Sequence, residues 1–506
     1  KSVLQENLAY QDMLDGRGFA FVDPHGDSAE ALLSKVPKER VEDVVYFNPA
    51  DTQYPLGFNP LEVTNPSQKT NISSEVIGVL KRMFGDSWGP RLEYILRYTI
   101  LALLDRPETT MLDITRMLTD KKFRKDTLSY CKDTVVLQFW NVEFASWTDK
   151  FQAEAIAPVL NKVGAFTANP VIRNIIGQPK STFNIRQIMD EGKILVVNLS
   201  KGLIGEDNAG ILGSFLVTKI QLAAMSRSDI PDIKDRRPFY LYVDEFQNFA
   251  TDSFATILSE ARKYGLNLTV ANQYISQMEE TVRDAVFGNV GTVISFRVSA
   301  DDSPILAKQF EPQFEPNDLL QMHNRNFIIN MVINGEKAPA FSAKTLNLPA
   351  AQDDNTGRII QWTRDNYSRD RSDIEADIAN RILPPENLVV KKPGPAYTPP
   401  KTPEQRAADR AARQAAKQSQ EQTQPIAKQP SVKLDKGAVG LLQIDHGQNN
   451  KDTSETANDN STAKSNATAK PTASGETADT ASGDKPKRKR TRSRRRKTPA
   501  ATSSNS

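Results

Sequence analysis

Short apolar runs rich in β-branched and aromatic residues alternate with stretches of helical periodicity along the N-terminal part of the chain. Runs of this kind fit strands that are buried on both faces, and helices between them supply the crossovers that parallel strands need. The pattern therefore predicts an α/β fold with a mostly parallel sheet. The candidate strands are residues 18–22, 44–47, 193–199, 239–243, 266–271 and 292–298.

A long region between the second and third candidate strands has helical periodicity and few strand signals. Its clearest amphipathic stretches are residues 73–84, 91–104 and 153–163. An all-α subdomain inserted into the α/β core at residues 73–170 is the simplest interpretation. After the core, alternating residues flank Asn334-Gly335, which is a strong β-hairpin signal.

The composition changes sharply towards the C-terminal end. Residues 445–506 contain no Val, Ile, Leu, Met, Phe, Tyr or Trp, and a segment that buries no apolar surface cannot offset its chain entropy. We therefore predict a disordered tail, preceded by a proline-rich segment at residues 384–403. The predicted division is 1–72 and 171–350 for the two parts of the α/β core, 73–170 for the insert, and 351–506 for linker and tail.

Ten basic residues and no acidic one lie within residues 485–497, so the net charge of +3 hides an acidic remainder. Such a cluster, without aromatic side chains for base stacking, can neutralise phosphates but cannot read base edges. The alternative is a solvated arm that binds nothing. The candidate nucleic-acid contacts are Lys485, Lys487, Arg488, Lys489, Arg490, Arg492, Arg494, Arg495, Arg496 and Lys497.

The sequence also excludes some classes of protein. A single cysteine, Cys131, cannot form an intrachain disulfide, and the three scattered histidines do not make a Cys/His zinc cluster with it. No uninterrupted apolar run approaches the roughly 18 residues that cross a bilayer. Because the chain begins with Lys1 and opens directly into an amphipathic pattern, we expect it to be a fragment, and a membrane anchor upstream stays open.

The most informative segment is FYLYVDEFQNF, in which a continuous apolar run ends at Asp244-Glu245. A buried strand that delivers two carboxylates at its C-terminal end, where open α/β sheets bind ligands, matches the Walker B arrangement. In that arrangement Asp244 holds Mg²⁺ through water and Glu245 polarises the attacking water. The alternative is a strand that merely stops at two solvated acids.

The start of the chain gives this interpretation its context. Lys1-Ser2 precede an amphipathic helix (VLQENLAYQDML) and then a strand (GFAFV), which is how a Walker A motif continues after its glycines. In that motif the lysine reaches the β- and γ-phosphates and the hydroxyl ligates Mg²⁺. Lys1, Ser2 and Asp244 are therefore the candidates for binding ATP and Mg²⁺. The glycines are expected upstream, and an arbitrary chain boundary is the alternative.

Two further candidates follow Asp244-Glu245 along the chain. Gln273 comes after the next strand, where an amide can bond both the γ-phosphate and the catalytic water, or can simply cap the next element. Arg262 comes near the end of the preceding helix, where a guanidinium can reach a nucleotide held by a neighbouring subunit. The alternative for Arg262 is a surface or intrachain salt bridge.

The turn after the first strand is a weaker candidate. Asp23 and His25 lie where the fold can aim either of them towards the nucleotide. A tight turn, with Asp27 or Ser28 capping the next helix, explains the same residues.

Several of these segments occur together in one order. They are Lys1-Ser2, residues 22–51, YPLGFNPL (54–61), LYVDEFQNFAT (241–251), ARKYGLNLTVANQ (261–273) and FRVSADDS (296–303). Taken together they resemble the conjugative coupling proteins of type IV secretion systems, the TraG/TraD-like branch of the HerA/FtsK superfamily of RecA-fold motor ATPases. The resemblance covers roughly residues 1–345.

The resemblance implies a RecA-like P-loop NTPase core with an inserted all-α domain, in a homohexameric ring with nucleotide at the subunit interfaces. It implies ATP-driven delivery of DNA to a secretion channel at the inner face of the cell membrane, with channel components and a DNA-processing relaxase complex as partners. By position, Lys1, Ser2, Asp244, Glu245 and Gln273 match nucleotide-site residues, and Arg262 matches a proposed trans-acting arginine. The family's glycine loop does not occur in the sequence, which leaves hydrolysis by the fragment alone open.

Two other functions also stay open. One is a HerA/FtsK-type translocase that acts in chromosome processing. The YFNPAD and FNPL strings favour the conjugative branch over this alternative. The other is a non-hydrolysing adaptor that keeps the fold in order to recognise cargo.

Overall fold

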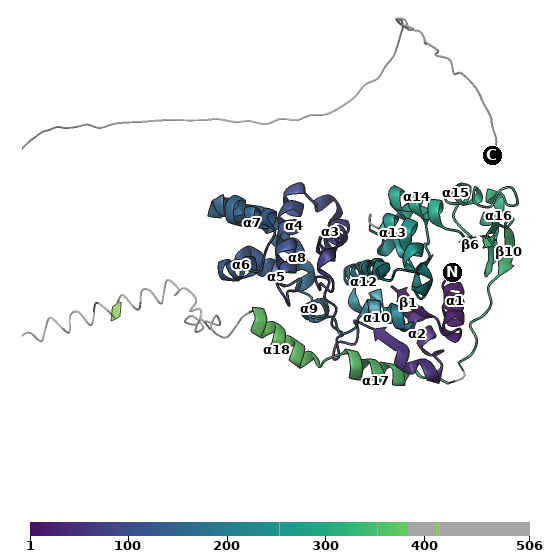
Figure 1. Cartoon of the computed structure of the whole chain (residues 1–506), viewed down its shortest axis with the longest axis horizontal. Helices are drawn as coiled ribbons and strands as arrows, with labels where there is room; N and C mark the ends of the chain where they lie inside the picture. Colours follow the sequence, from purple (N-terminus) through teal and green to yellow (C-terminus); the bar gives the residue numbers. More distant parts are fainter. Residues whose placement is uncertain (252–253, 352, 383–407, 409–410, 413, 415–506) are drawn as a thin grey trace, which may run out of the picture. The chain divides into compact units, whose positions relative to one another are not determined.

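The structure is a computed structural model that describes residues 1–251, 254–351 and 353–382, together with residues 408, 411, 412 and 414. The predicted tail, the proline-rich segment and the basic cluster at 485–497 lie outside the described residues. Figure 1 labels the helices and strands in chain order. The helices are α1 (Ser2–Leu14), α2 (Asp27–Leu33), α3 (Lys69–Phe84), α4 (Pro90–Asp105), α5 (Asp113–Thr119), α6 (Lys121–Leu128), α7 (Thr134–Gln138), α8 (Asp149–Thr167), α9 (Pro170–Ile176), α10 (Ile185–Glu191), α11 (Lys201–Ile204), α12 (Glu206–Ser226), α13 (Phe254–Glu260), α14 (Glu280–Asn289), α15 (Ser303–Ala307), α16 (Pro316–Leu320), α17 (Thr356–Tyr367) and α18 (Arg371–Ile382).

A parallel sheet of five strands forms the centre of the α/β core, in the order β2-β3-β1-β4-β5. The strands are β1 (Gly18–Asp23), β2 (Val44–Phe47), β3 (Ile194–Asn198), β4 (Phe239–Val243) and β5 (Leu266–Val270). The register aligns Val22 with Val243 and Val243 with Val270, so β1, β4 and β5 end at one edge of the sheet. After β1 the chain continues to β2, on one side of β1 in the sheet. After β4 it continues to β5, on the opposite side. The switch point between β1 and β4 is where open α/β sheets bind ligands.

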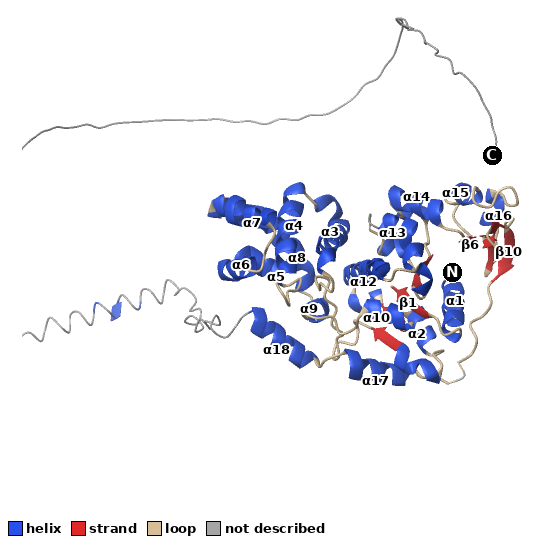
Figure 2. Cartoon of the chain, in the orientation of Figure 1, coloured by secondary structure: helices blue, strands red, loops and turns tan. Residues whose placement is uncertain are grey.

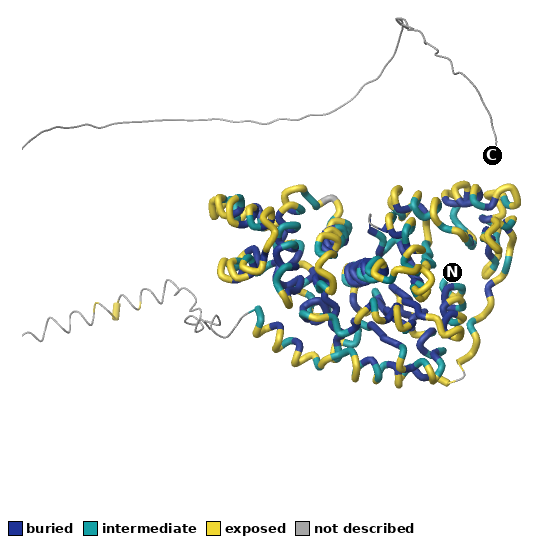
Figure 3. The backbone as a smooth tube through the Cα atoms, in the orientation of Figure 1, coloured by how far each residue is buried: buried dark blue, intermediate teal, exposed yellow. Residues whose placement is uncertain are grey.

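The sheet is buried on both faces because successive side chains of a strand point in opposite directions. Phe19 and Phe21 of β1 enter one hydrophobic core together with residues of α1, α2 and α17. Ala20 and Val22 enter the other core, which α12 covers. All residues of β1, β2 and β3 are buried, and these strands are dark blue in Figure 3.

α12 is the longest helix of this core, and 13 of its 21 residues are buried. The helical stretch Glu206–Asp229 is long and apolar enough to cross a membrane, and 72% of its apolar 18-residue window is buried inside the protein. It is the one such helix in the described part of the chain. A helix that is apolar on all sides is also expected at the centre of a large α/β core, so its composition is weak evidence for a membrane span.

The sixth candidate strand does not join the parallel sheet. β6 (Val293–Ser295) pairs antiparallel with β7 (Asn326–Asn330), which pairs antiparallel with β10 (Phe341–Lys344). Figure 2 shows this small sheet beside α16. It has a hydrophobic core of its own, which includes Phe310, Leu319 and Ile328, and this separate core explains why β6 pairs away from β5.

The predicted hairpin around Asn334-Gly335 is confirmed. β8 (Val332–Ile333) pairs antiparallel with β9 (Glu336–Lys337) across this turn. Both turn residues have positive φ, 54° and 88°, as a two-residue hairpin loop requires.

Between β2 and β3, in residues 48–193, all of which the structure describes, the chain has many helices and no strand, and Leu56 makes an isolated antiparallel bridge with Ser368. The helices include a π-helical turn, Phe139–Phe144, whose Phe139 ring stacks on Tyr98 with the ring centroids 4.5 Å apart. Trp140 and Phe144 belong to the same continuous hydrophobic core as one face of the sheet. The helices of the insert thus share a core with the α/β fold, and the boundaries 73 and 170 stay predictions.

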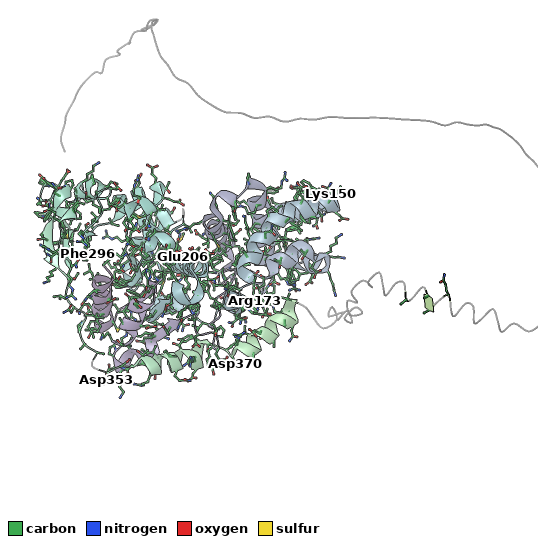
Figure 4. All side chains as sticks on the ribbon, turned by 180° about the vertical axis from the view of Figure 1, so that it is seen from behind. Lys150, Arg173, Glu206, Phe296, Asp353 and Asp370 are labelled. Atoms are coloured by element: carbon green, nitrogen blue, oxygen red, sulfur yellow. The ribbon has the colours of Figure 1, made fainter. Side chains whose placement is uncertain are left out.

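Residues 353–382, which the predicted division assigned to a linker, contain two helices that pack on the rest of the chain. Ile359 of α17 is fully buried in the core with α1 and α2, and the Thr363 hydroxyl accepts the amide of Tyr46 at 3.2 Å. Ile374 and Ile378 of α18 pack on Leu112. Buried residues four positions apart, Ile359 and Thr363 in α17 and Ile374 and Ile378 in α18, give each helix one packing face, which the linker prediction overlooked. Asp370, labelled in Figure 4, lies between the two helices.

Candidate nucleotide site

Lys1 and Ser2 lie against the two carboxylates that follow β4. The Lys1 Nζ is 2.5 Å from Oε1 of Glu245 and 3.2 Å from Oδ1 of Asp244. The Ser2 Oγ donates a hydrogen bond of 2.9 Å to Oδ2 of Asp244. Asp244 and Glu245 are buried, whereas the Lys1 side chain is 26% exposed. Two segments 242 positions apart in the chain therefore form one polar cluster at the predicted sheet edge.

Contacts along α1 hold its first turn at this edge. The Gln5 side-chain amide donates to the carbonyl oxygen of Val243 at 3.4 Å. Further along, the Tyr242 hydroxyl donates to Asp12 at 2.5 Å, and Arg17 pairs with the same carboxylate at 2.8 Å. Burial and the hydrogen bond to Asp12 raise the pKa of Tyr242, so it stays a neutral donor. α1 is thereby fixed to β4 along its length.

The backbone at Glu245 is left-handed, with φ 47° and ψ 49°. Non-glycine residues seldom adopt this region, and such strained residues cluster at functional sites. The turn brings the Glu245 carboxylate back to Lys1, and Oε2 accepts a hydrogen bond of 2.5 Å from the Gln247 side chain. The sequence analysis missed Gln247, because no spacing rule marks a polar residue two positions after the second acid.

A cavity of about 550 Å³ opens beside this cluster. Lys1 and Glu245 line it on one side, Gln273 follows the end of β5, and Arg297 comes from the segment after β6. The structure thus places Gln273 at the same cavity as the carboxylate cluster, with its side chain exposed. Arg297 is a further lining residue that sequence reasoning did not single out, although it lies in the FRVSADDS segment.

Arg262 lies away from this cavity within one chain. It belongs to the 3₁₀ turn Ala261–Tyr264, which precedes β5, whereas Gln273 follows the other end of that strand. A five-residue strand separates its ends by roughly 15 Å. The Arg262 side chain is exposed, so a partner from outside the chain can reach it.

The turn after β1 is organised by Asp23. Its Oδ1 accepts the amide of His25 at 2.8 Å, and its Oδ2 accepts the amide of Ala29 at 3.0 Å. Gly26 has φ 96°, and a Cβ there would lie 2.1 Å from the Ser200 Oγ. Asp23 therefore accepts hydrogen bonds from backbone amides at the start of α2. The His25 side chain is exposed. Neither Asp27 nor Ser28 accepts a hydrogen bond as the helix cap.

Comparisons with known proteins bear on this site and fold. Residues 238–307 match the family model described as the TraM recognition site of TraD and TraG. The bacterial conjugative coupling protein TrwBdeltaN70, in an unbound form, is similar with a TM-score of 0.51 and 18% identity, over 70% of this chain and 84% of that chain. The plasmid coupling protein TrwB, solved with ADP and Mg²⁺ and with the non-hydrolysable ATP analogue ADPNP, is similar with a TM-score of 0.50 and 17% identity in both structures, over 69% of this chain and 84% of theirs. A comparison with curated proteins gave no match.

The parallel sheet, with acids after β4 facing the first turn of α1, defines a RecA-like P-loop NTPase fold, and the likeness to TrwB shows the same fold. The family match runs from the residue before β4 to α15 and includes both acids. Within that class, the predicted resemblance to the conjugative coupling proteins is confirmed.

Proposed function

We propose that the chain is an ATP-driven motor subunit that delivers DNA to a type IV secretion channel. The observation that carries the proposal is the meeting of Lys1 and Ser2 with Asp244 and Glu245 at the switch point of the sheet. An ammonium, a hydroxyl and two carboxylates are the groups that a Walker A and a Walker B segment bring to one nucleotide.

Each residue then has a distinct role. The Ser2 hydroxyl and the Asp244 carboxylate are hard oxygen donors that suit Mg²⁺, which when bound neutralises charge on the β- and γ-phosphates. Lys1 binds those phosphates, and to do so it exchanges its present carboxylate partners for them. Glu245 orients the attacking water and takes its proton. Gln273, at the same cavity, bonds the γ-phosphate or that water.

Partners follow from the resemblance. The match to the TraM recognition site of TraD and TraG supports recognition of a TraM-like protein, and through it of a relaxase complex. A homohexamer with nucleotide at its interfaces gives the exposed Arg262 a site to act on. We further propose that the basic residues in 485–497 hold DNA through its phosphates. The same resemblance supports work at the inner face of the cell membrane.

The direct test is DNA-stimulated ATP hydrolysis by the full-length protein. We expect the ATPase rate to rise with DNA, and Lys1→Ala to lower it about a hundredfold because phosphate charge is no longer neutralised. Lys150→Ala is the matched control, since Lys150 lies on α8 away from the cavity and is exposed (Figure 4). An ATPase rate that does not change when DNA is added, or that Lys1→Ala does not lower, would contradict the proposed motor function.

The role of Arg262 is tested by mixing two inactive proteins. Arg262→Ala subunits keep Lys1, and Lys1→Ala subunits keep Arg262, so some interfaces of a mixed ring contain both residues. Random assembly of equal amounts is expected to recover roughly a quarter of the ATPase rate per ring. If mixed rings stay as inactive as the separate variants while still forming hexamers by mass, Arg262 does not act across the interface.

A further inference from the structure

One arginine on α3, Arg82, reaches the turn that follows the two acids. Both terminal nitrogens of Arg82, on α3, donate to backbone carbonyls of this turn, one to Gln247 and the other to Ala250. We define residues 246–250 as the Glu245 turn. Arg82 is partly buried, and the planar fork of a guanidinium can hold two carbonyls in a fixed relation, which a lysine cannot.

Residues of the Glu245 turn also position the Glu245 carboxylate. The Gln247 side chain donates to Oε2 of Glu245 at 2.5 Å, while Oε1 faces Lys1. A shift of the Gln247 backbone therefore moves the donor that fixes the orientation of this carboxylate. Misplacement of a reacting group by about 1 Å is enough to slow a reaction substantially.

Other contacts also hold this turn: the Phe246 amide donates to the Ala271 carbonyl at 2.8 Å, and the Phe246 and Phe254 ring centroids lie 4.5 Å apart. Phe249 lies against Gly213 of α12 so closely that a Cβ at Gly213 would come 2.2 Å from its ring. Among the described residues, the Gln247 Oε1 and the Asn248 Nδ2 are buried without a hydrogen-bond partner. The turn is thus clamped between α3 on one side and α12 on the other, with polar atoms left over that another arrangement can satisfy.

We propose that Arg82 is a positioning residue for Glu245, through which the inserted helices set the rate of ATP hydrolysis. α3 packs on α4 of the insert and on α12 of the core, so Arg82 offers a route by which a displacement of the insert reaches the Glu245 turn. This inference rests on the proposed function, because it requires Glu245 to act on nucleotide. A partner that binds the insert can thereby change the position of Glu245, and with it the rate at which water attacks the nucleotide.

The test compares Arg82→Met and Arg82→Lys with Arg97→Met in the full-length protein. Arg97 lies on α4 and bonds Glu93 and Ser74, both in the insert, so it is the matched control. For Arg82→Met we expect kcat for ATP to fall about tenfold while KM and the affinity for ADPNP change less than about twofold. Arg82→Lys is expected to recover part of kcat, and Arg97→Met to behave as the unsubstituted protein.

A double-mutant cycle separates positioning from general loss of structure. If Arg82 acts through Gln247, the rate of Arg82→Met combined with Gln247→Ala is expected to equal that of the slower single variant. The inference is overturned if the double variant loses the product of the two single losses in rate, or if Arg82→Met leaves kcat unchanged. If Arg82→Met does not fold, the same double-mutant cycle can be made with Arg82→Lys and Gln247→Ala. An unsubstituted protein that does not hydrolyse ATP contradicts the proposed function itself, whereas a hydrolysing protein indifferent to Arg82 contradicts only this step.

Discussion

Glu245→Gln in the full-length protein is expected to bind ATP and to hydrolyse it about a thousandfold more slowly. The amide keeps the size of the carboxylate and its acceptor oxygen, but it cannot take a proton from water. Because Glu245 also pairs with Lys1, its neutralisation frees the ammonium for phosphate, so the affinity for ATP should be equal or higher. Single-turnover hydrolysis, with ATP binding measured separately, distinguishes the two effects.

The matched control for this variant is Glu280→Gln, which removes an exposed carboxylate at the start of α14. It should leave both binding and hydrolysis unchanged. A Glu245→Gln protein that turns over at the normal rate would remove Glu245 as the residue that activates water. A protein that loses ATP binding would assign it to the binding of nucleotide instead.

Arg227→Met is expected to lower the free energy of unfolding by about 3 kcal/mol. The Arg227 side chain is fully buried, and its Nε lies 2.8 Å from Asp190. Its two terminal nitrogens donate to the carbonyls of Tyr264 at 3.1 Å and Met189 at 3.3 Å. Methionine fills a similar volume but makes none of these three hydrogen bonds, and the loss of the bonds of a buried guanidinium is costly. Urea unfolding measures the change.

Arg186→Met is the control, because Arg186 pairs with the same Asp190 carboxylate from a side chain that is 24% exposed. Its loss should cost less than about 1 kcal/mol, as for other solvent-accessible ion pairs. Equal costs for the two variants would show that burial of Arg227 adds nothing. Tyr264 ends the 3₁₀ turn that carries Arg262, so Arg227→Met should also lower any activity that depends on Arg262.

The parallel strands were predictable because they are buried on both faces and give continuous apolar runs. The same signal cannot say which sheet a strand joins, and for this reason the separate pairing of β6 was missed. The helices α17 and α18 were missed for a different reason. Each presents only a few apolar contacts, such as Ile374 and Ile378 of α18, in an otherwise polar segment, and the surface that these residues cover exists only in the folded chain.

The site shows the same contrast. Asp244 and Glu245 could be found because strand and acids are contiguous, and Lys1-Ser2 because helix and strand follow in a fixed order. Gln247 and Arg82 have no such pattern. The contact of Arg82 joins residues 165 and 168 positions apart, and it depends on how α3 packs beside α12. A role that arises from tertiary packing leaves no local mark in the sequence.

We expect α17 and α18 to shape how the described part of the chain responds to mechanical tension. α18 ends at Ile382, and its Arg381 donates to the Gly177 carbonyl at 3.0 Å and pairs with Asp113 at 3.2 Å. A pull on the chain after Ile382 is expected to load these contacts first and then the packing of Ile378 and Ile374 on Leu112, so α18 should detach from the inserted helices from its C-terminal end. Ile359 of α17 lies deep in the core and bears the load only afterwards. Whatever holds the C-terminal segment under tension thus acts on the inserted helices well before it can disturb the sheet.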